Sequence, residues 1–375
     1  MKILLFSNTD WYLYNFRLKL AKDLQAEGYD VILLSPPGKY ATSLGAEGFR
    51  WLQIPLERRG MNPLTEMLTI LKLVSVYRRE RPDLIHHFTI KCVLYGSLAA
   101  RICGVPAVVN SITGVGYLFT NTGWLIGLLQ KLVKAWYRLV LKRTQVIFEN
   151  EDNLGMFVDL GLVEAGQANL VRSAGVDVGR YLPAEEPEGI PVVMLASRML
   201  WDKGIGEFVQ AARILRERDV QAQFVLVGDT YADNPRAISR EQLVGWQEQG
   251  AVAWWGWQED MPAILQKANL VCLPSYSEGV PTVLLEAAAT QRAVITTNAP
   301  GCRDAVIPGV SGLLVPVKEA SALAEAIRKL VEDPALRSSM GRAGRSLVER
   351  EYSSKKVLEG TIRVYQKAGL KDFQA

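Results

Sequence analysis

Two glutamates in the second half of the chain have the type and spacing to bind a sugar. Glu278 and Glu286 flank a short segment in which a buried strand pattern is followed by a turn and, from Pro281, by a helix pattern. Proline fits the first turn of a helix, so Glu278 precedes the helix and Glu286 lies about one and a half turns inside it. Both carboxylates can therefore face one crevice. Ionised carboxylates only accept hydrogen bonds, which suits the vicinal hydroxyls of a ribose or a hexose and indicates a nucleotide-sugar ligand.

Two cations at an earlier strand-to-helix turn strengthen this interpretation. An apolar strand pattern at 191–197 leads into Arg198 and Lys203, and 206–218 is then typical of an amphipathic helix. In open parallel sheets such turns lie at the carboxyl ends of strands, where helix amides face anions. Arg198 and Lys203 are therefore predicted to bind a diphosphate. The alternatives are that both cations are solvated and that the two glutamates only complement a helix dipole or face solvent.

The elements that must position these residues alternate along the chain. Strand-like runs and helical patterns follow one another, which is typical of parallel α/β sheets. The strand-like runs cover 2–6, 31–35, 84–86, 105–111, 192–196, 223–228, 252–255, 270–274, 293–297 and 312–315. A proline-rich acidic stretch at 183–191 separates two sets of runs. We therefore predict two doubly wound domains, 1–182 and 183–353, and a last helical segment, 354–375, that crosses back to the first domain.

Composition argues against several other classes of protein. Of the 375 residues, 49% are apolar, which is enough for two packed cores. No run of about 18 or more apolar residues predicts a membrane span, and the first residues are too few for a signal peptide. The four cysteines form no CxxC pair, which predicts reduced thiols and a cytoplasmic protein. With two histidines and no D-x-D pair, we expect no metal and no other cofactor.

Motifs along nearly the whole chain resemble those of the retaining glycosyltransferases of family 4, which have a GT-B fold of two Rossmann-like domains facing a central cleft. Besides the two charged pairs, these motifs are Gly175–Asp177, Val227–Asp229, Leu273–Ser275, Pro300–Arg303 and Gly309–Pro316. The resemblance implies that the two cations bind the diphosphate of a UDP-sugar, that Glu278 holds its hexose and that Glu286 holds its ribose. Backbone amides of Gly279 and Val280 would add contacts to the hexose or phosphate. It also implies retention of the anomeric configuration without an enzyme nucleophile.

Three motifs in the first half are similar to those of bacterial enzymes that extend a sugar on undecaprenyl diphosphate, especially N-acetylgalactosaminyltransferases and related hexosaminyltransferases. They are Tyr14–Arg17, His86–Lys91 and Ile112–Phe119. The resemblance implies a polyprenyl-diphosphate-linked saccharide as the acceptor, bound by the first domain. The loop 7–11 lacks the glycines that let relatives approach the donor, so Asp10, Asn15 and Arg17 are candidates to meet the acceptor. Arg17 is the candidate phosphate ligand, unless it lies on a solvated helix face.

Other first-domain residues are candidates for the cleft. Gly114, shortly after a strand pattern, would let backbone amides approach a donor phosphate, or would only form a tight turn. Alternation along a strand sends His86 and His87 to opposite faces, so one of them is predicted to act in catalysis as a sugar-hydroxyl ligand. A buried structural histidine is the alternative, because Phe88 stands where many relatives have a second histidine. Lys91 would help neutralise a diphosphate, or would be solvated.

Charge is unevenly divided along the chain. Residues 1–180 contain 21 Lys and Arg against 15 Asp and Glu, whereas the remainder contains 22 against 24. The segment 117–143 combines many aromatic and aliphatic residues with cations and no acid, which suits an anionic membrane surface. Its cations are Lys131, Lys134, Arg138, Lys142 and Arg143. A core-packed helix with Leu128, Leu132, Ala135 and Leu139 on one face explains it equally well. No nucleic-acid-binding pattern accompanies these charges.

The residues and the resemblance together predict a retaining, metal-independent glycosyltransferase. It would move a hexosamine (GalNAc or GlcNAc), or another hexose, from a UDP-sugar to a polyprenyl-diphosphate-linked saccharide in the assembly of bacterial surface or glycoprotein glycans. Its expected place is the inner face of the cytoplasmic membrane, to which it would bind peripherally. The alternatives are a transferase with a soluble acceptor, a nucleotide-sugar epimerase of the same shape, and a noncatalytic sugar-binding protein. The oligomeric state does not follow from these patterns.

Overall fold

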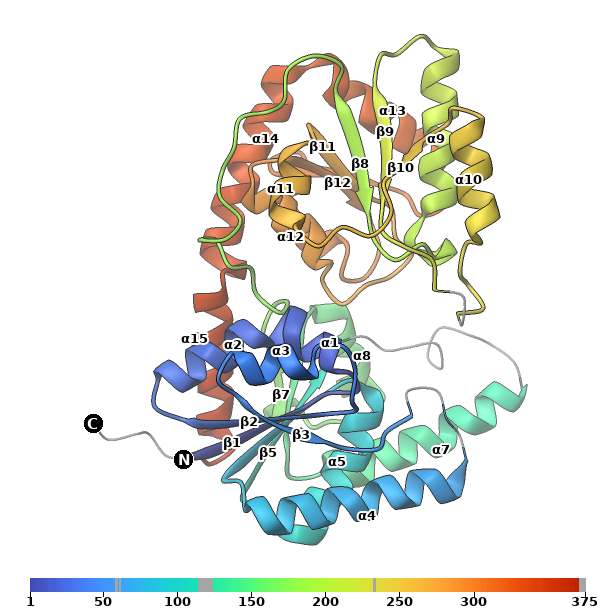
Figure 1. The fold of residues 1–375 in the computed structure, drawn as a ribbon. Coiled ribbons are helices and arrows are strands. Elements are labelled where there is room, and N and C mark those ends of the chain that lie inside the picture. Colours follow the sequence, from blue (N-terminus) through green and yellow to red (C-terminus); the bar gives the residue numbers. More distant parts are fainter. Residues whose placement is uncertain (58–59, 61, 114–123, 232–233, 371–375) are drawn as a thin grey trace. The chain divides into compact units, whose positions relative to one another are not determined.

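Two compact units make up the chain. The computed structural model describes residues 1–57, 60, 62–113, 124–231 and 234–370, with 124–129 described by their backbone only. Unit 1 comprises Met1–Ala174 and Ser354–Ala375, and unit 2 comprises Gly175–Ser353. Each unit contains one parallel sheet with helices on both of its faces (Figure 1). The predicted α/β architecture with two doubly wound parallel sheets is confirmed.

The chain passes from unit 1 to unit 2 after Ala174, which is upstream of the acidic stretch 183–191. Residues after Ala174 pack with unit 2, because the Val176 amide donates to the Tyr352 carbonyl oxygen at 2.9 Å and Tyr181 is buried in the core of that unit. The segment from Ser354 onward belongs to unit 1.

The sheet of unit 1 has seven parallel strands. They are β1 (Lys2–Phe6), β2 (Asp30–Ser35), β3 (Arg50–Gln53), β4 (Leu84–Phe88), β5 (Ala107–Ile112), β6 (Gln145–Phe148) and β7 (Ala168–Leu170). Their spatial order is β3-β2-β1-β4-β5-β6-β7. The sequence did not predict β3, β6 or β7. These strands have only three or four residues each, and β3 and β7 are the two edge strands, so none of them forms a long apolar run.

Helices cover both faces of this sheet. They are α1 (Asp10–Tyr12), the π-helix η1 (Leu13–Arg17), α2 (Leu18–Ala26), α3 (Ala41–Ala46), α4 (Pro63–Glu80), α5 (Ile90–Cys103), α7 (Trp124–Leu141), α8 (Glu151–Asp159), the 3-10 helix η2 (Ala165–Gln167) and α15 (Ser354–Lys367). One core lies under α4, α5, α7 and α8, and the other lies under α2, α3 and α15. Helices α4, α5 and α7 lie together at the bottom of Figure 1.

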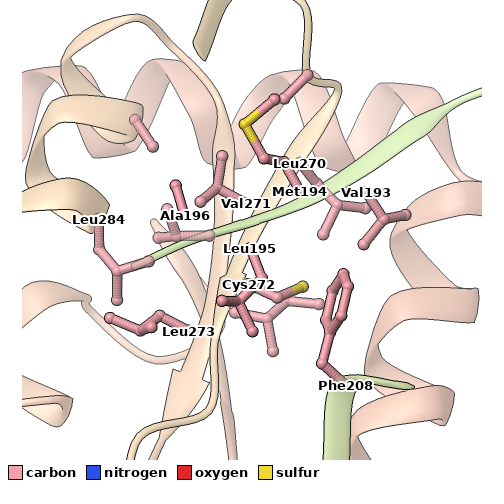
Figure 2. Packing of buried hydrophobic residues seen from close by; sticks show 14 of the residues in the cluster. Val193, Met194, Leu195, Ala196, Phe208, Leu270, Val271, Cys272, Leu273 and Leu284 are labelled. Carbon is pink, nitrogen blue, oxygen red and sulfur yellow. The ribbon is translucent and has the colours of Figure 1, made fainter. Parts of the chain in front are cut away.

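The sheet of unit 2 has six parallel strands. They are β8 (Val192–Ala196), β9 (Gln223–Val227), β10 (Ala253–Trp254), β11 (Leu270–Leu273), β12 (Ala293–Thr297) and β13 (Gly312–Val315), in the spatial order β10-β9-β8-β11-β12-β13. The helices are η3 (Trp201–Lys203), α9 (Ile205–Glu217), α10 (Arg240–Glu248), α11 (Met261–Gln266), α12 (Thr282–Ala289), η4 (Arg303–Ala305), α13 (Ala320–Glu332), α14 (Pro334–Leu347) and η5 (Val348–Tyr352). Figure 2 shows the apolar side chains of β8 and β11 packed with Phe208 of α9.

Strand order reverses at one place in each sheet. In unit 1 the chain leaves β1 toward β2 on one side and later returns to β4 on the other, and in unit 2 it does the same around β8 and β11. Ligands of open α/β sheets bind outside the carboxyl ends of the strands at such a switch point. The fold therefore gives each unit one favoured place for a ligand, between β1 and β4 and between β8 and β11.

Candidate active site

The switch point of unit 2 carries the predicted donor-binding residues. Arg198 and Lys203 follow β8, and Glu278 follows β11, the neighbouring parallel strand. The two loops therefore emerge at the same edge of the sheet. The Lys203 ammonium forms an ion pair with Glu278 Oε1, and both side chains are largely buried. The structure thus brings together one cation and one carboxylate that lie far apart in the sequence.

A glycine allows the first of these loops to pack closely against the second. Gly204 has φ +73°, and a Cβ there would lie 2.1 Å from the Pro274 carbonyl oxygen. The Tyr276 amide also donates to the Asp202 carbonyl oxygen at 3.0 Å. Gly204 is the N-cap of α9, and Lys203 is the last residue of the preceding 3-10 helix η3. A side chain at position 204 would push apart the two loops that hold the ion pair.

A second glycine supports the Glu278 loop from the other side. Gly301 has φ +75°, and a Cβ there would lie 1.9 Å from the Gly279 carbonyl oxygen. The Glu278 amide donates to the Pro300 carbonyl oxygen at 3.1 Å. The side chain of Val280 is buried in the core of unit 2. The backbone around Glu278 is therefore fixed by its neighbours, while contacts of the Gly279 and Val280 amides with a donor stay a prediction.

Arg198 differs from Lys203 in its surroundings. It is partly buried, and its Cζ lies 5.8 Å from the centre of the Tyr231 ring. The guanidinium forms no ion pair within the part of the chain that the structure describes. A cation without a paired carboxylate at the carboxyl end of β8 suits an anionic ligand.

Glu286 is held by a residue that the sequence analysis missed. It lies within α12, and its Oε1 accepts a hydrogen bond from the Tyr181 hydroxyl at 2.8 Å. Burial raises the pKa of Glu286 to about 7, although the Tyr181 hydrogen bond and the positive charge of Arg180 oppose the shift. Tyr181 is held in turn by Arg345, whose Nη1 donates to the Tyr181 carbonyl oxygen at 2.6 Å. No spacing in the sequence marks Tyr181, because its partners come from distant helices.

Arg17, at the switch point of unit 1, is buried rather than solvated. It ends the π-helix η1, and its Nη2 donates to the Tyr12 hydroxyl at 2.6 Å and forms an ion pair with Glu149 at 3.2 Å. Its Cζ lies 4.5 Å from the centre of the Phe88 ring. Burial alone would lower the pKa of Arg17. The interactions with Tyr12 and Glu149 raise this pKa by more than burial lowers it, so the net shift is upward. The alternative of a solvated helix face is therefore wrong, and a contact with acceptor phosphate stays a prediction.

Asp10 and Asn15 make local contacts. The buried Asp10 carboxylate accepts hydrogen bonds from the Trp11 amide at 2.8 Å and from the Tyr40 amide at 2.7 Å. Asn15 is exposed, and its Nδ2 donates to the Trp11 carbonyl oxygen at 2.9 Å. Asp10 thus fixes the loop before α3, and Asn15 is the more accessible of the two. Their roles toward an acceptor stay predictions.

Both nitrogens of the His86 ring have partners inside unit 1. Nδ1 lies 2.9 Å from the Tyr365 hydroxyl of α15, and Nε2 lies 2.7 Å from the Ser111 hydroxyl of β5. The ring also packs on Phe88 with centres 4.0 Å apart, as alternation along the strand predicts. Burial, with the nearby positive charge of Arg17, holds the pKa of His86 well below its usual range.

His87 points to the opposite core and is equally enclosed. Its Nδ1 lies 2.9 Å from Asn110 Oδ1 and its Nε2 lies 3.1 Å from the Tyr77 hydroxyl of α4. Burial lowers its pKa to about 4, although the hydrogen bond that Asn110 Oδ1 accepts from the ring opposes the shift. The contacts of His86 and His87 are those of structural histidines, the alternative that the sequence left open. A catalytic role for either one stays a prediction.

Lys91 is also engaged. Its Nζ donates to the carbonyl oxygens of Glu57 at 2.8 Å and Gly60 at 2.5 Å and to Glu66 Oε1 at 2.6 Å. A lysine ammonium has three donors, so this conformation leaves none for a diphosphate. The alternative of a solvated lysine is wrong, because these contacts tie α5 to the loop before α4. Gly114 lies outside the described residues.

Comparison with known proteins identifies the family. The profile described as "Glycosyl transferase 4-like" matches residues 2–150, and that described as "Glycosyl transferases group 1" matches residues 183–347. The chain belongs to this glycosyltransferase family. The resemblance inferred from the motifs is therefore confirmed.

Curated relatives of this glycosyltransferase span almost its entire length. It is 29% identical to the N,N'-diacetylbacillosaminyl-diphospho-undecaprenol alpha-1,3-N-acetylgalactosaminyltransferase of Campylobacter jejuni, over 91% of this chain and 92% of that protein. It is 25% identical to the UDP-Gal:alpha-D-GlcNAc-diphosphoundecaprenol alpha-1,3-galactosyltransferase of Escherichia coli, over 84% of this chain and 83% of that protein.

Solved structures confirm the GT-B fold of the glycosyltransferase. A glycosyltransferase from Rickettsia africae aligns with a TM-score of 0.81 and 18% identity, over 98% of each chain. HepE from Anabaena, in complex with UDP and glucose, aligns with a TM-score of 0.76 and 19% identity, over 99% of this chain and 100% of that one. At these identities the likeness concerns the fold alone.

Two further properties of the glycosyltransferase come from the described residues. None of their helices combines the length and hydrophobicity needed to cross a bilayer. Among these same residues, His, Cys, Asp and Glu side chains form no group of three or more that could hold a metal ion.

Proposed function

We propose that this glycosyltransferase transfers a hexosamine from a UDP-sugar to a saccharide linked to polyprenyl diphosphate, with retention and without a metal. The observation that carries the donor assignment is the Lys203–Glu278 ion pair at the switch point of unit 2, where ligands of such sheets bind. The names of the relatives from C. jejuni and E. coli, which act on diphospho-undecaprenol-linked sugars, support the acceptor class.

The charged groups of the site suit departure of a nucleoside diphosphate. The bond between the sugar C1 and the phosphate oxygen breaks, and its electron pair stays on the diphosphate. Arg198 and Lys203 would stabilise this growing negative charge, which is the type of contribution that dominates many enzymatic rate enhancements. Two cations in the donor site would supply the charge that a divalent ion supplies elsewhere, so the reaction is proposed to need none.

The carboxylates would orient the donor. Glu278 would accept hydrogen bonds from the hexose and Glu286 from the ribose hydroxyls. Glu278 is already paired with Lys203, so a bound diphosphate would compete for that cation. The acceptor hydroxyl would bond to C1 on the face that the diphosphate leaves, and its proton would pass to a leaving phosphate oxygen. This sequence balances without an enzyme nucleophile and retains the anomeric configuration.

The proposed acceptor determines where in the cell the enzyme acts. A polyprenyl-diphosphate-linked saccharide is anchored in a membrane, so the enzyme is proposed to act at the inner face of the cytoplasmic membrane. Exposed cations of α7 and the turn after it, including Lys131, Arg138 and Lys142, would favour an anionic surface.

Purified enzyme tests the proposal. It is incubated with UDP-sugars and membrane-extracted polyprenyl-diphosphate saccharides in the presence of a metal chelator, while nucleoside diphosphate release and lipid mass are followed together. A single hexosamine increment on the lipid, with an unchanged anomeric configuration by NMR, is expected. Donor consumption without a lipid mass shift would replace the proposal with a soluble acceptor or an epimerase. Donor binding without any turnover would indicate a sugar-binding protein.

A further inference from the structure

Helix α4 of unit 1 exposes a stripe of large apolar side chains. Leu64, Met67, Leu68 and Leu71 are 74%, 58%, 62% and 58% exposed. Their spacing of three, four and seven residues places them on one face of the helix. The opposite face is also apolar and is filled, because Leu73 and Tyr77 pack into the core below α4. The helix therefore has one apolar face that the core covers and a second one that unit 1 leaves in solvent.

Charge on the outer surface of α4 has a single sign. Both of its carboxylates are turned inward: Glu66 pairs with Lys91, and the buried Glu80 pairs with Arg50 at 2.7 Å and with Arg79 at 2.8 Å. The exposed charged residues of the helix are Lys72, Arg78 and Arg79. The outer surface is thus apolar in its first half and cationic in its second half.

A second helix over the same core also exposes apolar side chains. Leu132 and Leu139 of α7 are 62% and 54% exposed, while Tyr137 and Val140 of the same helix face the core. The alternative in which Leu132 and Leu139 are packed in the core is therefore wrong. Helices α4, α5 and α7 cover the same core, so their outer faces lie on one side of unit 1 (Figure 1).

We propose that the outer face of α4 inserts into a lipid surface that carries anionic headgroups. The proposal rests on the proposed function, because a polyprenyl-linked acceptor requires the enzyme to work at a bilayer. Exposed leucines beside cations, without an exposed carboxylate on the helix, match the two parts of such an interface: acyl chains take up the leucines, and Lys72, Arg78 and Arg79 meet the headgroups. A second copy of the chain fits less well, because its α4 would bring the same cations and no exposed acid to the contact.

Flotation with lipid vesicles tests the proposal. Wild-type enzyme is compared with Leu68→Gln/Leu71→Gln, using vesicles of phosphatidylcholine alone and vesicles that also contain phosphatidylglycerol. The matched control is Ile190→Gln/Val310→Gln in unit 2, whose two side chains are 61% and 54% exposed. We expect the α4 variant to lose about tenfold or more in binding to the anionic vesicles, because less apolar area enters the bilayer. The control should bind like wild type, and Lys72→Gln/Arg78→Gln should weaken binding to the anionic vesicles only.

Several outcomes would contradict the proposal that α4 docks on lipid. Equal flotation of the α4 variant and wild type would do so, and so would equal binding of wild type to neutral and anionic vesicles. Sedimentation velocity tests whether the stripe instead contacts a second copy of the chain. A dimer that the wild type forms and the α4 variant does not, with equal vesicle binding of both, would show that it does. Thermal unfolding at the wild-type temperature would show that the substituted side chains were on the surface and that the variant is folded.

Activity separates this proposal from the proposed function. With a short-chain, water-soluble acceptor analogue, the α4 variant should turn over at the wild-type rate, whereas with the lipid acceptor in vesicles its rate should fall with its binding. If wild type binds vesicles through α4 but transfers no sugar to any lipid acceptor, the docking surface stands and the proposed function fails. If the α4 variant transfers sugar to vesicle-bound acceptor as fast as wild type, the docking surface is rejected and the function stands.

Discussion

The two switch points contain arginines with opposite surroundings. Arg17 of unit 1 is buried, pairs with Glu149 and stacks near Phe88, whereas Arg198 of unit 2 is partly exposed and forms no ion pair within the described residues. The equivalent place in two similar sheets thus holds a neutralised internal cation in one unit and a cation suited to a ligand in the other. Of these two arginines, Arg198 is therefore the better candidate for a ligand, because its charge is not paired with a carboxylate among the described residues.

Replacing Arg17 should have the largest effect on stability. Arg17→Met leaves the buried Glu149 without this cation, and breaking a buried ion pair from one side costs about 3–5 kcal/mol. Urea unfolding of the variant should show this loss. Arg218→Met, which breaks an exposed pair with Glu325, is the control and should leave the free energy of unfolding nearly unchanged. An Arg17 variant that is fully stable but inactive would make Arg17 a ligand and end the contrast.

Arg198→Met should lower activity and leave stability nearly unchanged, the reverse of the effect expected for Arg17→Met. Its removal breaks no ion pair among the described residues, so stability should change little. Transfer should fall about 100- to 1000-fold in kcat, as is typical when a group that stabilises developing charge is lost. Steady-state kinetics with saturating donor measures this change. An unchanged kcat would remove Arg198 from the donor site.

Gly301→Ala should displace the loop that contains Glu278. The backbone at φ +75° costs about 1–2 kcal/mol for a residue with a Cβ. The new Cβ would also collide with the Gly279 carbonyl oxygen, so the Glu278 loop must shift and donor affinity should fall. Gly309→Ala is the matched control, because Gly309 has the same φ but no atom within 4 Å of its Cβ position. Calorimetric titration with UDP-sugar should distinguish the two variants, and equal affinities would show that the loop tolerates the shift.

Ionisation of Glu286 should give the smallest effect, a pH dependence confined to unit 2. Its pKa is raised from 4.5 to about 7 by burial, so between these values the folded state binds more protons than the unfolded state. Its contribution to stability therefore falls as pH rises through this window. Affinity for UDP should instead rise about tenfold between about pH 6 and about pH 8, because the ionised carboxylate accepts the ribose hydroxyls.

Two variants check this assignment. Glu286→Gln should flatten the pH dependence of the UDP dissociation constant. Tyr181→Phe removes a hydrogen bond that lowers the pKa of the carboxyl, so the midpoint should move to higher pH while the shape of the curve is kept. A curve that stays the same in both variants would assign the titration to another group.

The sequence placed the candidate donor residues of unit 2 correctly at strand ends, because the signals of these loops are local. A strand, a turn and a helix are each written in consecutive residues, so Lys203 and Glu278 could be placed at strand ends. The contacts of unit 1 were not predictable in this way. Arg17 pairs with Glu149, and His86 contacts Tyr365, so each contact joins distant segments of the sequence. Nothing in the spacing of a buried cation shows that its partner exists.

Helical periodicity has a related weakness. It indicates that a helix is amphipathic but not which apolar residues the core accepts. Leu132 and Leu139 have the same spacing as a core-packed face, yet both are exposed. In α4 two apolar faces coexist, and the packing of the helix against α5 and the sheet decides which one is buried.

Unit 1 is built from two pieces of sequence that are separated by the whole of unit 2. Val357, Val364 and Tyr365 of α15 fill the same core as Ile3 and Leu5 of β1. While the ribosome is still translating residues 175–353, one face of the first sheet therefore has α2 and α3 but lacks α15. We expect unit 2 to fold first during synthesis and the nascent first sheet to depend on chaperones until α15 emerges, because exposed apolar sheet surface aggregates readily.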